Sequence, residues 1–576
     1  VVWAIGSRRE RGWRAWRWAA AAIACRLLFV YVPPAFPLLS SELVSPDTYA
    51  SARLGLLLIS PFDLLLTAIT LLILAAVALD GAGRVSPARS SLIRMFGASL
   101  LAVPILAGTL RLIEDTVVNC SLDLTVLPLV PRSAAHLAIH LALLAVMAAG
   151  ALGLASALML GGPAPGTRGL RRALVLALAG VVTAGVRYAP GGQDAPVLVV
   201  FLLFALVGGA VVEGRAAEER LRALRPGAVA ALVLLGVAAL AALLYPTLVH
   251  DTQQTLRIQI ERDYAPLVLR QPEWRQYVLQ GTERAIDSMN PLEDAPPGIY
   301  PPGIEEMAFA VWSATDLSAY GFSSAIEIQD VNGTVISRFA LNLPSIASRE
   351  RRLPGAAEWR VSREPVSLAS TETLVLHAQR LLNYHGEAHG AIHVYVGEDF
   401  WSLPFVQGRD PYSVLYRNTA RGGLPDRPVT LLVYDTHRDV AFSSAERPPA
   451  LDPGLSARAA EASRRGDGVW TTLEVDGVSQ HAYVFATADL VYALTYRRFS
   501  PGRYAADLVE AVSAFTLLGV LVLVLVVLVR SVLRRPSLSL PSLLAAVGRR
   551  FALRLFVAFT LVAFVPAAVL QVVVSG

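Results

Sequence analysis

Histidines are the side chains of this sequence whose spacing could support metal chemistry. His385, His389 and His393 lie close together, with Glu387 among them. On a β-strand, His389 and His393 would share a face because side chains alternate, and His377 lies on the preceding predicted strand. Imidazoles beside a carboxylate suit zinc or copper. The intervening glycine-rich turn supplies no rigid frame, so we predict a solvated hairpin without a metal.

A second group of polar residues falls in or near predicted membrane helices. His136 and His140 are four residues apart, so they share one helix face. Asp63 lies in another apolar segment, and Arg111, Glu114 and Asp115 lie at the outer end of the third span. All would lie toward the outer leaflet, where they could form a small polar or metal site. Pairing between helices is the alternative that we favour.

No catalytic motif appears in the sequence. All 50 basic residues are arginine, whereas a P-loop, a protein kinase and Schiff-base chemistry each need a lysine. The sequence also lacks the metalloprotease and serine-hydrolase motifs. We therefore expect no catalytic residue and no cofactor in this chain, and no ligand-binding residue can be named from the sequence.

The composition predicts a membrane protein with several spanning helices. Hydrophobic residues make up 54% of the 576 positions, and the mean hydropathy is +0.52. A spanning helix needs about 20 apolar residues. The segments that meet this pattern are 16–32, 54–79, 95–113, 134–160, 173–186, 196–212, 228–249, 508–529 and 551–574.

The placement of arginine predicts the orientation of these helices. Arginines cluster in alternate loops, at 8–17, 84–94, 168–172, 215–225 and 530–550. The other short loops carry only Arg53, Arg132 and Arg187. Because cytoplasmic loops are enriched in basic residues, the N-terminus is predicted to be cytoplasmic and residues 250–505 extracytoplasmic, in a bacterial inner membrane. The bilayer is then a partner, and nucleic acid is not expected to be one.

The polar block between the seventh and eighth predicted spans alternates like β-structure. It opens with a helix over 252–289, which Pro266 and Pro272 should break or kink. Strands at 324–330 and 334–339 flank an Asn-Gly turn, which is a hairpin signal. Two further strands are expected at 373–380 and 390–397.

A second set of elements follows the first. Strands are expected at 428–435 and 440–444, a helix at 456–465, and a three-stranded meander at 469–475, 479–487 and 491–498. Four aromatic residues of the meander could line a pocket, although we favour a role in the core. They are Trp470, Tyr483, Tyr492 and Tyr496.

This order of elements resembles extracytoplasmic PAS-like (Cache) sensor domains. The resemblance is carried by IEIQDVNGTVISRF in the first copy, and by LLVYDTHRDVAFSS with VWTTLEVDGVSQHAYVF in the second. The stretch RRFALRLFVAFTLVAFVPAAVLQ is similar to the membrane-proximal part of multispan bacterial sensor histidine kinases. The resemblance implies a ligand pocket between a sheet and its covering elements, but no pocket residue carries over.

The predicted fold class is a membrane α-helical bundle plus an α+β extracytoplasmic domain with tandem PAS-like antiparallel sheets. The predicted parts are a seven-helix region (1–249), a stalk helix with the first sensor subdomain (250–410), a second subdomain (411–505), an eighth span (506–530), a cytoplasmic loop (531–550) and a ninth span (551–576).

The function predicted from these parts is the sensory portion of a two-component histidine kinase. Its partners would be a small-molecule or membrane signal, a second copy of the chain, and a response regulator reached through a kinase portion beyond residue 576. Both ends of the sequence look truncated, which fits that expectation. The alternatives are a transporter or membrane enzyme with an accessory domain, or the sensor of a chemoreceptor or cyclic-nucleotide cyclase.

Overall fold

The computed structural model describes most of the chain in two compact units. The described residues are 11–31, 42–55, 57–82, 92–125, 133–161, 168–188, 196–223, 226–289, 303–343, 358–368, 371–384, 387–406, 429–498 and 501–534. Residues 1–255 with 499–576 form the first unit, and residues 256–498 form the second.

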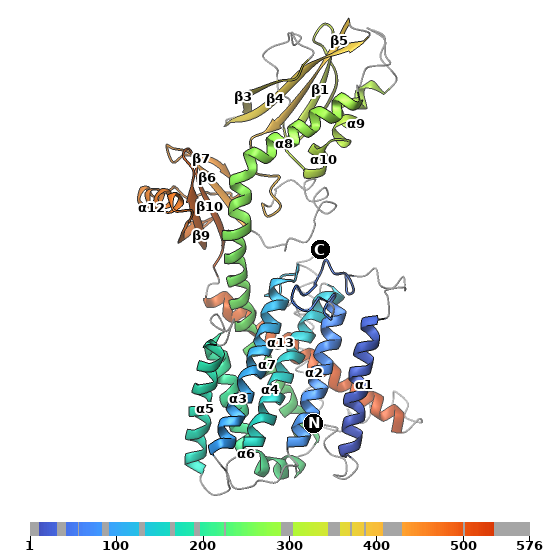
Figure 1. Cartoon of the computed structure of the whole chain (residues 1–576), viewed down its shortest axis with the longest axis vertical. Coiled ribbons are helices and arrows are strands. Elements are labelled where there is room, and N and C mark those ends of the chain that lie inside the picture. Colours follow the sequence, from blue (N-terminus) through green and yellow to red (C-terminus); the bar gives the residue numbers. More distant parts are fainter. Residues whose placement is uncertain are drawn as a thin grey trace, which may run out of the picture. The chain divides into compact units, whose positions relative to one another are not determined.

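The first unit is helical in its described residues. Figure 1 shows its helices gathered in a bundle, in which α4 packs against both α2 and α3. The helices are α1 (Arg11–Tyr31), α2 (Pro61–Ala82), α3 (Leu92–Val118), α4 (Ala134–Gly161), α5 (Arg168–Tyr188), α6 (Val197–Ala223), α7 (Pro226–Gln259) and α13 (Pro501–Arg534).

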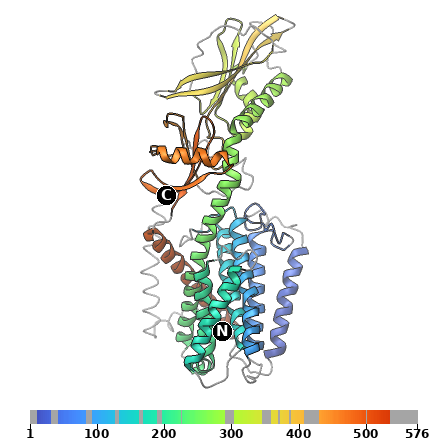
Figure 2. The ribbon, with the colours of Figure 1, turned by 60° about the vertical axis from the view of Figure 1, so that its left-hand side comes forward.

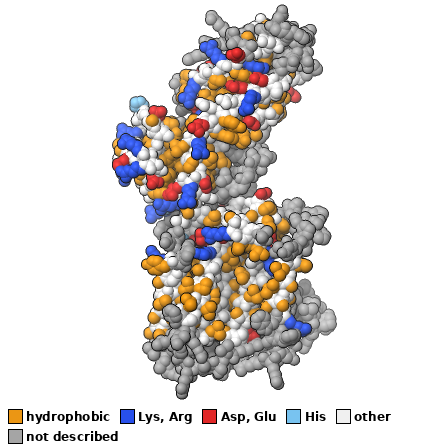
Figure 3. Space-filling view, viewed as in Figure 1, with side chains coloured by type: hydrophobic (Ala, Val, Ile, Leu, Met, Phe, Trp, Pro, Cys, Tyr) orange, Lys and Arg blue, Asp and Glu red, His pale blue; other side chains and the backbone are white. Residues whose placement is uncertain are grey.

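Several of these helices have the length and composition of membrane spans. Within the described residues, four helical stretches are long and apolar enough to cross a bilayer, namely 61–82, 97–118, 134–160 and 231–289. Shorter apolar helices cover 19–28, 173–188 and 197–210. Figure 3 shows hydrophobic side chains spread over the visible face of this unit. The count of nine spans stays a prediction, and its last member, 551–574, lies outside the described residues.

Small residues allow the helices of the bundle to approach closely. A Cβ atom added to Gly150 of α4 would lie 2.6 Å from Thr109 Oγ1 of α3. A Cβ at Gly153 would lie 3.2 Å from Ile105 Cγ2 on the same neighbouring helix. Such small-residue contacts are typical of helices that associate in lipid.

The second helix begins later than the sequence analysis predicted. The apolar run from residue 54 suggested an early start, but α2 begins at Pro61. The hydroxyl of Ser60 accepts a hydrogen bond from the Asp63 amide at 3.2 Å and donates to the Asp63 carboxylate at 2.9 Å. Serine before proline is a strong helix start signal, and it outweighs the hydrophobicity of the preceding residues.

The second unit contains two antiparallel five-stranded sheets with the same strand order. The first sheet has the order β2-β1-β5-β4-β3, and the second has β7-β6-β10-β9-β8. The predicted pair of antiparallel sheets is confirmed. The strands are β1 (Ser324–Asp330), β2 (Val335–Leu341), β3 (Arg360–Leu368), β4 (Thr371–Tyr384), β5 (Glu387–Gly397), β6 (Thr430–Tyr434), β7 (Val440–Ser443), β8 (Val469–Val475), β9 (Val478–Ala486) and β10 (Val491–Arg497).

Strand β3 was missed by the sequence analysis. Pro365 lies in its middle, and proline argues against a central strand because it has no N–H to donate. In the sheet, β3 pairs only with β4 and forms an edge. An edge strand tolerates proline because one side of its backbone has no neighbouring strand to pair with.

The first hairpin of each sheet is built on the same turn. Asp330 Oδ1 accepts from the amides of Asn332 and Thr334, at 2.9 and 2.7 Å. Asp435 Oδ1 accepts from the amides two and four residues later, both at 2.8 Å. The fourth turn residue is left-handed in both, Gly333 with φ 78° and Arg438 with φ 71°. The two sheets therefore repeat one local design as well as one strand order.

Helices pack against the faces of both sheets. In the first sheet, one face packs against α8 (Ala265–Met289), η3 (Ile304–Glu306), α9 (Met307–Ser313) and α10 (Asp316–Tyr320) through an apolar core. In the second sheet, α12 (Pro453–Arg464) covers one face, as Figure 2 also shows. The other face of the second sheet packs against residues 256–268.

The helix that follows the last N-terminal span does not break at its prolines. Helical structure is continuous from α7 through the π-helical turn η2 (Ile260–Tyr264) into α8. The π turn stands immediately before Pro266, where an adjustment of the hydrogen-bond ladder is expected. Pro272 lies inside α8. Of the predicted break or kink, the structure excludes the break and shows a π turn beside Pro266.

Tertiary hydrogen bonds hold α8 in place around Pro272. Gln271 Nε2 donates to Ser402 Oγ at 2.6 Å, and Arg275 Nη2 donates to the Asp399 carbonyl at 2.9 Å. Both helical residues are buried. These contacts anchor the helix on both sides of the proline, which explains why the helix continues.

The repeated turn makes a testable prediction about stability. Replacing Arg438 by glycine should stabilise the protein by about 0.5–1 kcal/mol, because a left-handed conformation costs a side-chain-bearing residue more than it costs glycine. Gly333→Arg should destabilise by a similar amount. Thermal unfolding of the full chain measures both effects. As a control, Arg458→Gly on the exposed face of α12 should destabilise, and a destabilised Arg438→Gly protein would contradict the argument.

Candidate functional site

One face of the first sheet is polar although it is buried. Side chains alternate between faces along each strand, and register places five polar residues in a row across all five strands. In strand order β2 to β3 they are Arg338, Glu327, His393, Gln379 and Arg360. Glu327 and His393 are 2% and 1% exposed. Burying such groups costs free energy unless they are hydrogen-bonded, so their partners matter.

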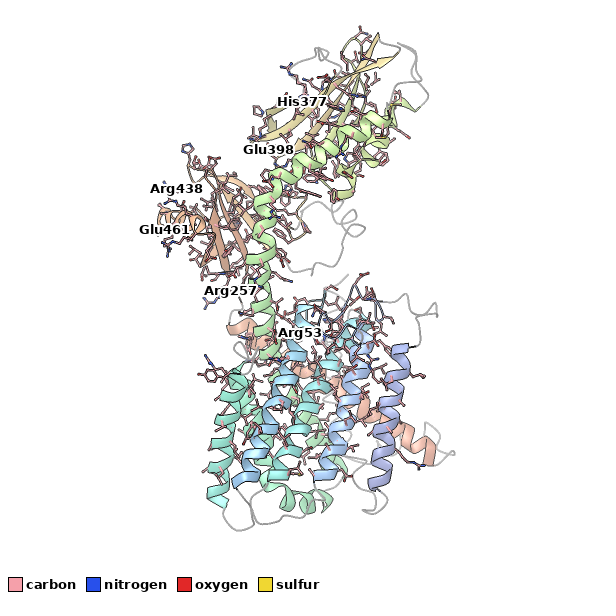
Figure 4. All side chains as sticks on the ribbon, viewed as in Figure 1. Arg53, Arg257, His377, Glu398, Arg438 and Glu461 are labelled. Atoms are coloured by element: carbon pink, nitrogen blue, oxygen red, sulfur yellow. The ribbon has the colours of Figure 1, made fainter. Side chains whose placement is uncertain are left out.

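Three ionisable side chains on this face form a hydrogen-bonded chain. Glu364 Oε1 lies 2.7 Å from His377 Nδ1, and His377 Nε2 lies 2.9 Å from His393 Nδ1. The ring of Tyr395 stacks on His377 with centroids 4.3 Å apart. The residues come from β3, β4 and β5, and Figure 4 shows His377 on this sheet. The pairing of these three strands therefore brings the three hydrogen-bonded side chains together.

Burial and charge set the protonation states of Glu364 and His393, the outer members of this hydrogen-bonded series. Burial alone would raise the pKa of Glu364, but the hydrogen bonds from His377 and Ser362 outweigh it and hold that pKa below its usual value. Burial lowers the pKa of His393 to about 4, and the neighbouring His377 adds to the effect. At neutral pH, Glu364 is therefore ionised and His393 is neutral.

Two polar atoms on the same face lack a protein partner. His393 Nε2 and Gln329 Oε1 are buried and have no hydrogen-bond partner among the described residues. Gln329 lies two residues from Glu327 on β1, and Glu327 stands opposite His393. The atoms belong to adjoining positions of one sheet face. Unpaired buried polar atoms are costly, and a small polar ligand that hydrogen-bonds to them would remove that cost.

An ion pair flanks these atoms. Arg338 Nε lies 3.1 Å from Glu327 Oε1, and Glu327 is almost fully buried. The pair joins β2 to β1 and reduces the charge that Glu327 presents to the face. The face can thus supply hydrogen bonds and a partly compensated carboxylate to a ligand.

The hairpin histidines were predicted to be solvated and free of metal, but the structure buries His393, which is 1% exposed. His385 lies outside the described residues, and His389 lies in β5, where its side chain is not described. His393 pairs with His377 and not with an ion. In the described residues, no group of three or more His, Cys, Asp or Glu side chains is arranged to hold a metal. That the hairpin binds no metal stays a prediction.

The membrane histidines contact backbone carbonyls. His136 Nε2 lies 3.2 Å from the Asp123 carbonyl, and His140 Nε2 lies 3.2 Å from the Leu124 carbonyl. Their rings meet edge to face with centroids 4.4 Å apart. The pair therefore joins α4 to the segment that follows α3.

Asp63 has a partner that the sequence analysis did not identify. Arg26 of α1 pairs with Asp63 Oδ1 at 3.1 Å, donates to Thr67 Oγ1 at 2.8 Å, and also contacts the Leu57 carbonyl. Arg26 was visible as an arginine inside the first predicted span, and such residues commonly pair with another helix. The contacts of Arg26 and of the membrane histidines agree with interhelical pairing.

The aromatic residues of the second sheet belong to its core. Tyr483, Tyr492 and Tyr496 are buried in the cluster that packs against residues 256–268, with Trp470 at its edge. Trp470 Nε1 donates to Glu261 Oε1 at 2.5 Å, and Arg257 lies 4.9 Å above the Trp470 ring. These residues bind the helix to the sheet, as the core interpretation predicted.

Glu364 is the residue of this candidate site that the sequence analysis missed. It lies on β3, the strand that was not predicted, and 13 residues from His377. The alternation Ser362, Glu364 along β3 was the available signal. That signal has no meaning until β3 is known to pair with β4.

Comparisons with known proteins identify sensory domains. No protein-family model matches the sequence, and no curated protein matches it. The Campylobacter jejuni chemoreceptor Tlp3 ligand-binding domain, in complex with L-norvaline, is 8% identical, with a TM-score of 0.23 over 42% of this chain and 90% of that one. The Vibrio cholerae LuxQ periplasmic domain is 15% identical, with a TM-score of 0.22 over 39% and 94%.

A third similar structure is the extracellular domain of rpHK1S-Z16, whose name assigns it to the histidine kinases. It is 12% identical, with a TM-score of 0.20 over 38% of this chain and 88% of that one. These matches are to periplasmic, extracellular or ligand-binding domains of receptors, and each covers about two fifths of this chain. Identities and scores of this size carry no argument about ligand or activity.

The lowered pKa of buried His393 leads to a prediction of how the stability of the protein depends on pH. Unfolded His393 takes up a proton near pH 6.5, whereas folded His393 does so only near pH 4. The unfolded state therefore binds more protons between these values, so stability is lost as pH falls, by up to about 3 kcal/mol. His393→Gln should reduce the fall in melting temperature from pH 7 to pH 4.

A matched control separates this effect from general acid denaturation. His437→Gln, at an exposed turn of the second sheet, should keep the wild-type pH dependence. An unchanged pH dependence in His393→Gln would show that His393 does not stay neutral in the folded protein.

Proposed function

We propose that this chain is the sensory and transmembrane portion of a bacterial membrane receptor, and specifically of a two-component sensor histidine kinase. A small polar molecule would bind the polar face of the β1–β5 sheet. The carrying observation is the pair of buried atoms that have no hydrogen-bond partner among the described residues, His393 Nε2 and Gln329 Oε1. Buried polar groups of this kind are expected to meet a ligand or water.

The route of the signal follows the continuous helix. One face of the β1–β5 sheet carries the proposed site, and the opposite face packs on α8. Helical structure runs without a break from α8 back through η2 to α7. A ligand would shift this assembly only by binding one of two arrangements more tightly than the other. The π turn at 260–264 is a suitable place for a change of helical register.

The arginine distribution supports the proposed orientation, with residues 250–505 outside the cytoplasm and the N-terminus inside. Single-cysteine labelling can test this after Cys25 and Cys120 are replaced by serine. An impermeant maleimide should label Ser313→Cys in intact cells, because Ser313 is exposed in the sensor unit. Ser537→Cys should react only after lysis. If Ser537→Cys alone were labelled in intact cells, the orientation would be the reverse of the proposed one.

A histidine kinase is the output that the resemblance of the C-terminal segment favours. Membranes that contain the natural gene product should incorporate label from radioactive ATP into a phosphohistidine, which is lost in acid and retained in alkali. Membranes without the gene product are the control. Cyclase activity, or label on serine or threonine, would instead assign the sensor to a different class of receptor.

A second copy of the chain is the proposed partner. Trp274 and Tyr277 of α8 stack with centroids 5.4 Å apart, and Tyr320 of α10 packs edge-on to Trp274 at 5.0 Å. Tyr277 and Tyr320 are about half exposed, at 55% and 46%. Clustered exposed aromatic residues are typical of interfaces. This aromatic patch is our proposed contact in a homodimer, with the response regulator contacting the kinase portion.

The alternative of a transporter has less support. A transport pathway would need polar groups in the membrane that are available to a substrate. Asp63 is paired with Arg26, and the His136–His140 pair is bonded to backbone carbonyls. The polar residues that motivated this alternative are therefore already used in contacts between segments of the bundle.

A further inference from the structure

The hydrogen bonds from Glu364 through His377 to His393 on the β1–β5 sheet run in one donor-to-acceptor direction. This direction decides which type of ligand the site can bind. We propose that Glu364, acting through His377, fixes His393 with a bare Nε2 lone pair toward the ligand, so that the site takes groups that donate N–H or O–H hydrogen bonds. This inference rests on the proposed function, in which a small molecule binds this face. Glu364 and His377 are positioning residues in it, and His393 is the contact residue.

The direction begins at the carboxylate. An ionised carboxylate only accepts hydrogen bonds. Glu364 Oε1 lies 2.7 Å from His377 Nδ1 and also accepts from Ser362 Oγ at 2.9 Å. His377 Nδ1 must therefore carry its hydrogen. This is the second-sphere arrangement by which a carboxylate sets the tautomer of a histidine.

The direction continues through the two rings. In a neutral imidazole with hydrogen on Nδ1, Nε2 is an acceptor. His377 Nε2 is 2.9 Å from His393 Nδ1. With a neutral His377, His393 Nδ1 is the donor between them, whereas a protonated His377 would reverse this hydrogen bond. In the neutral pair His393 has no hydrogen on Nε2, the buried atom that has no hydrogen-bond partner among the described residues. The hydrogen bond to Glu364 and a neutral His377 thus determine the form of the terminal nitrogen.

Two further groups beside His393 on this face offer acceptor atoms. Gln329 Oε1 is buried without a hydrogen-bond partner among the described residues, and Glu327 stands opposite His393 in the register. Arg338, on the neighbouring strand, is a cation that is engaged with Glu327. A carboxylate or phosphate would place acceptors against acceptors in a buried site, which is costly. An ammonium, amidinium, amide or hydroxyl group would instead donate to His393 Nε2 and Gln329 Oε1.

The tautomer is directly measurable in the full chain. The protein has nine histidines, so ¹⁵N-histidine labelling in lipid nanodiscs gives a small set of signals, and His393→Gln identifies the signal of His393. We expect wild-type His393 to show a protonated Nδ1 and a bare Nε2 at neutral pH. In Glu364→Gln the amide can donate as well as accept, so His393 should become a mixture of tautomers. A protonated Nε2 in the wild type would overturn the inference.

A matched pair of probes tests the selectivity. Acetamidinium has only donors and acetate has only acceptors, although their shapes are nearly the same. Acetamidinium should perturb the His393 Nε2 signal and raise the melting temperature, whereas acetate should do neither. Glu364→Gln should weaken acetamidinium binding about tenfold or more. His481→Gln, in the second sheet, is the control and should bind as the wild type does.

The outcomes separate this inference from the function on which it rests. If acetate perturbs His393 and acetamidinium does not, the face binds a ligand but the inferred polarity is wrong. If neither probe affects His393 or the melting temperature, the face is not a ligand site, and both proposals fail. If both bind equally, or if Glu364→Gln binds acetamidinium as tightly as the wild type, Glu364 does not set the selectivity.

Discussion

The pairing of β1 with β5 is the interaction on which the rest of the first sheet depends. It joins segments 60 to 72 residues apart, from Ser324 opposite Val396 to Asp330 opposite Gly390. One register decides both faces of the sheet. It places Ile326 and Ile328 among the apolar residues beneath the helices, and it sets Glu327 opposite His393 on the other face. A shift by one residue would exchange the two faces.

The two sheets repeat one topology but use their faces differently. In the second sheet, the face that is not covered by α12 is aromatic and apolar, and it packs on residues 256–268. In the first sheet, the face opposite the helices carries the hydrogen-bonded polar side chains beside a small apolar cluster around Tyr395. The repeated backbone therefore supports two tasks: attachment of the long helix in one copy, and a polar site in the other.

The polar contacts of the helical unit follow from the cost of leaving charge unpaired in lipid. Arg26 is almost fully buried and uses its guanidinium on Asp63, on Thr67 and on a backbone carbonyl. Removing one member of such a pair leaves the other charge buried, which is expensive. These contacts hold α1 and α2 together where apolar packing alone would give little orientation.

Local patterns in the sequence determined the strands of both hairpins, the meander and the apolar helices. The strand at 324–330, its Asn-Gly turn and the strand at 469–475 were all predicted from alternation and turn residues. Those signals depend on near neighbours in the chain. The tertiary structure alone decided that β3 is an edge strand despite Pro365, that Arg26 meets Asp63, and that Glu364, His377 and His393 form one chain. Each depends on register between segments 13 to 37 residues apart, and no local pattern specifies that register.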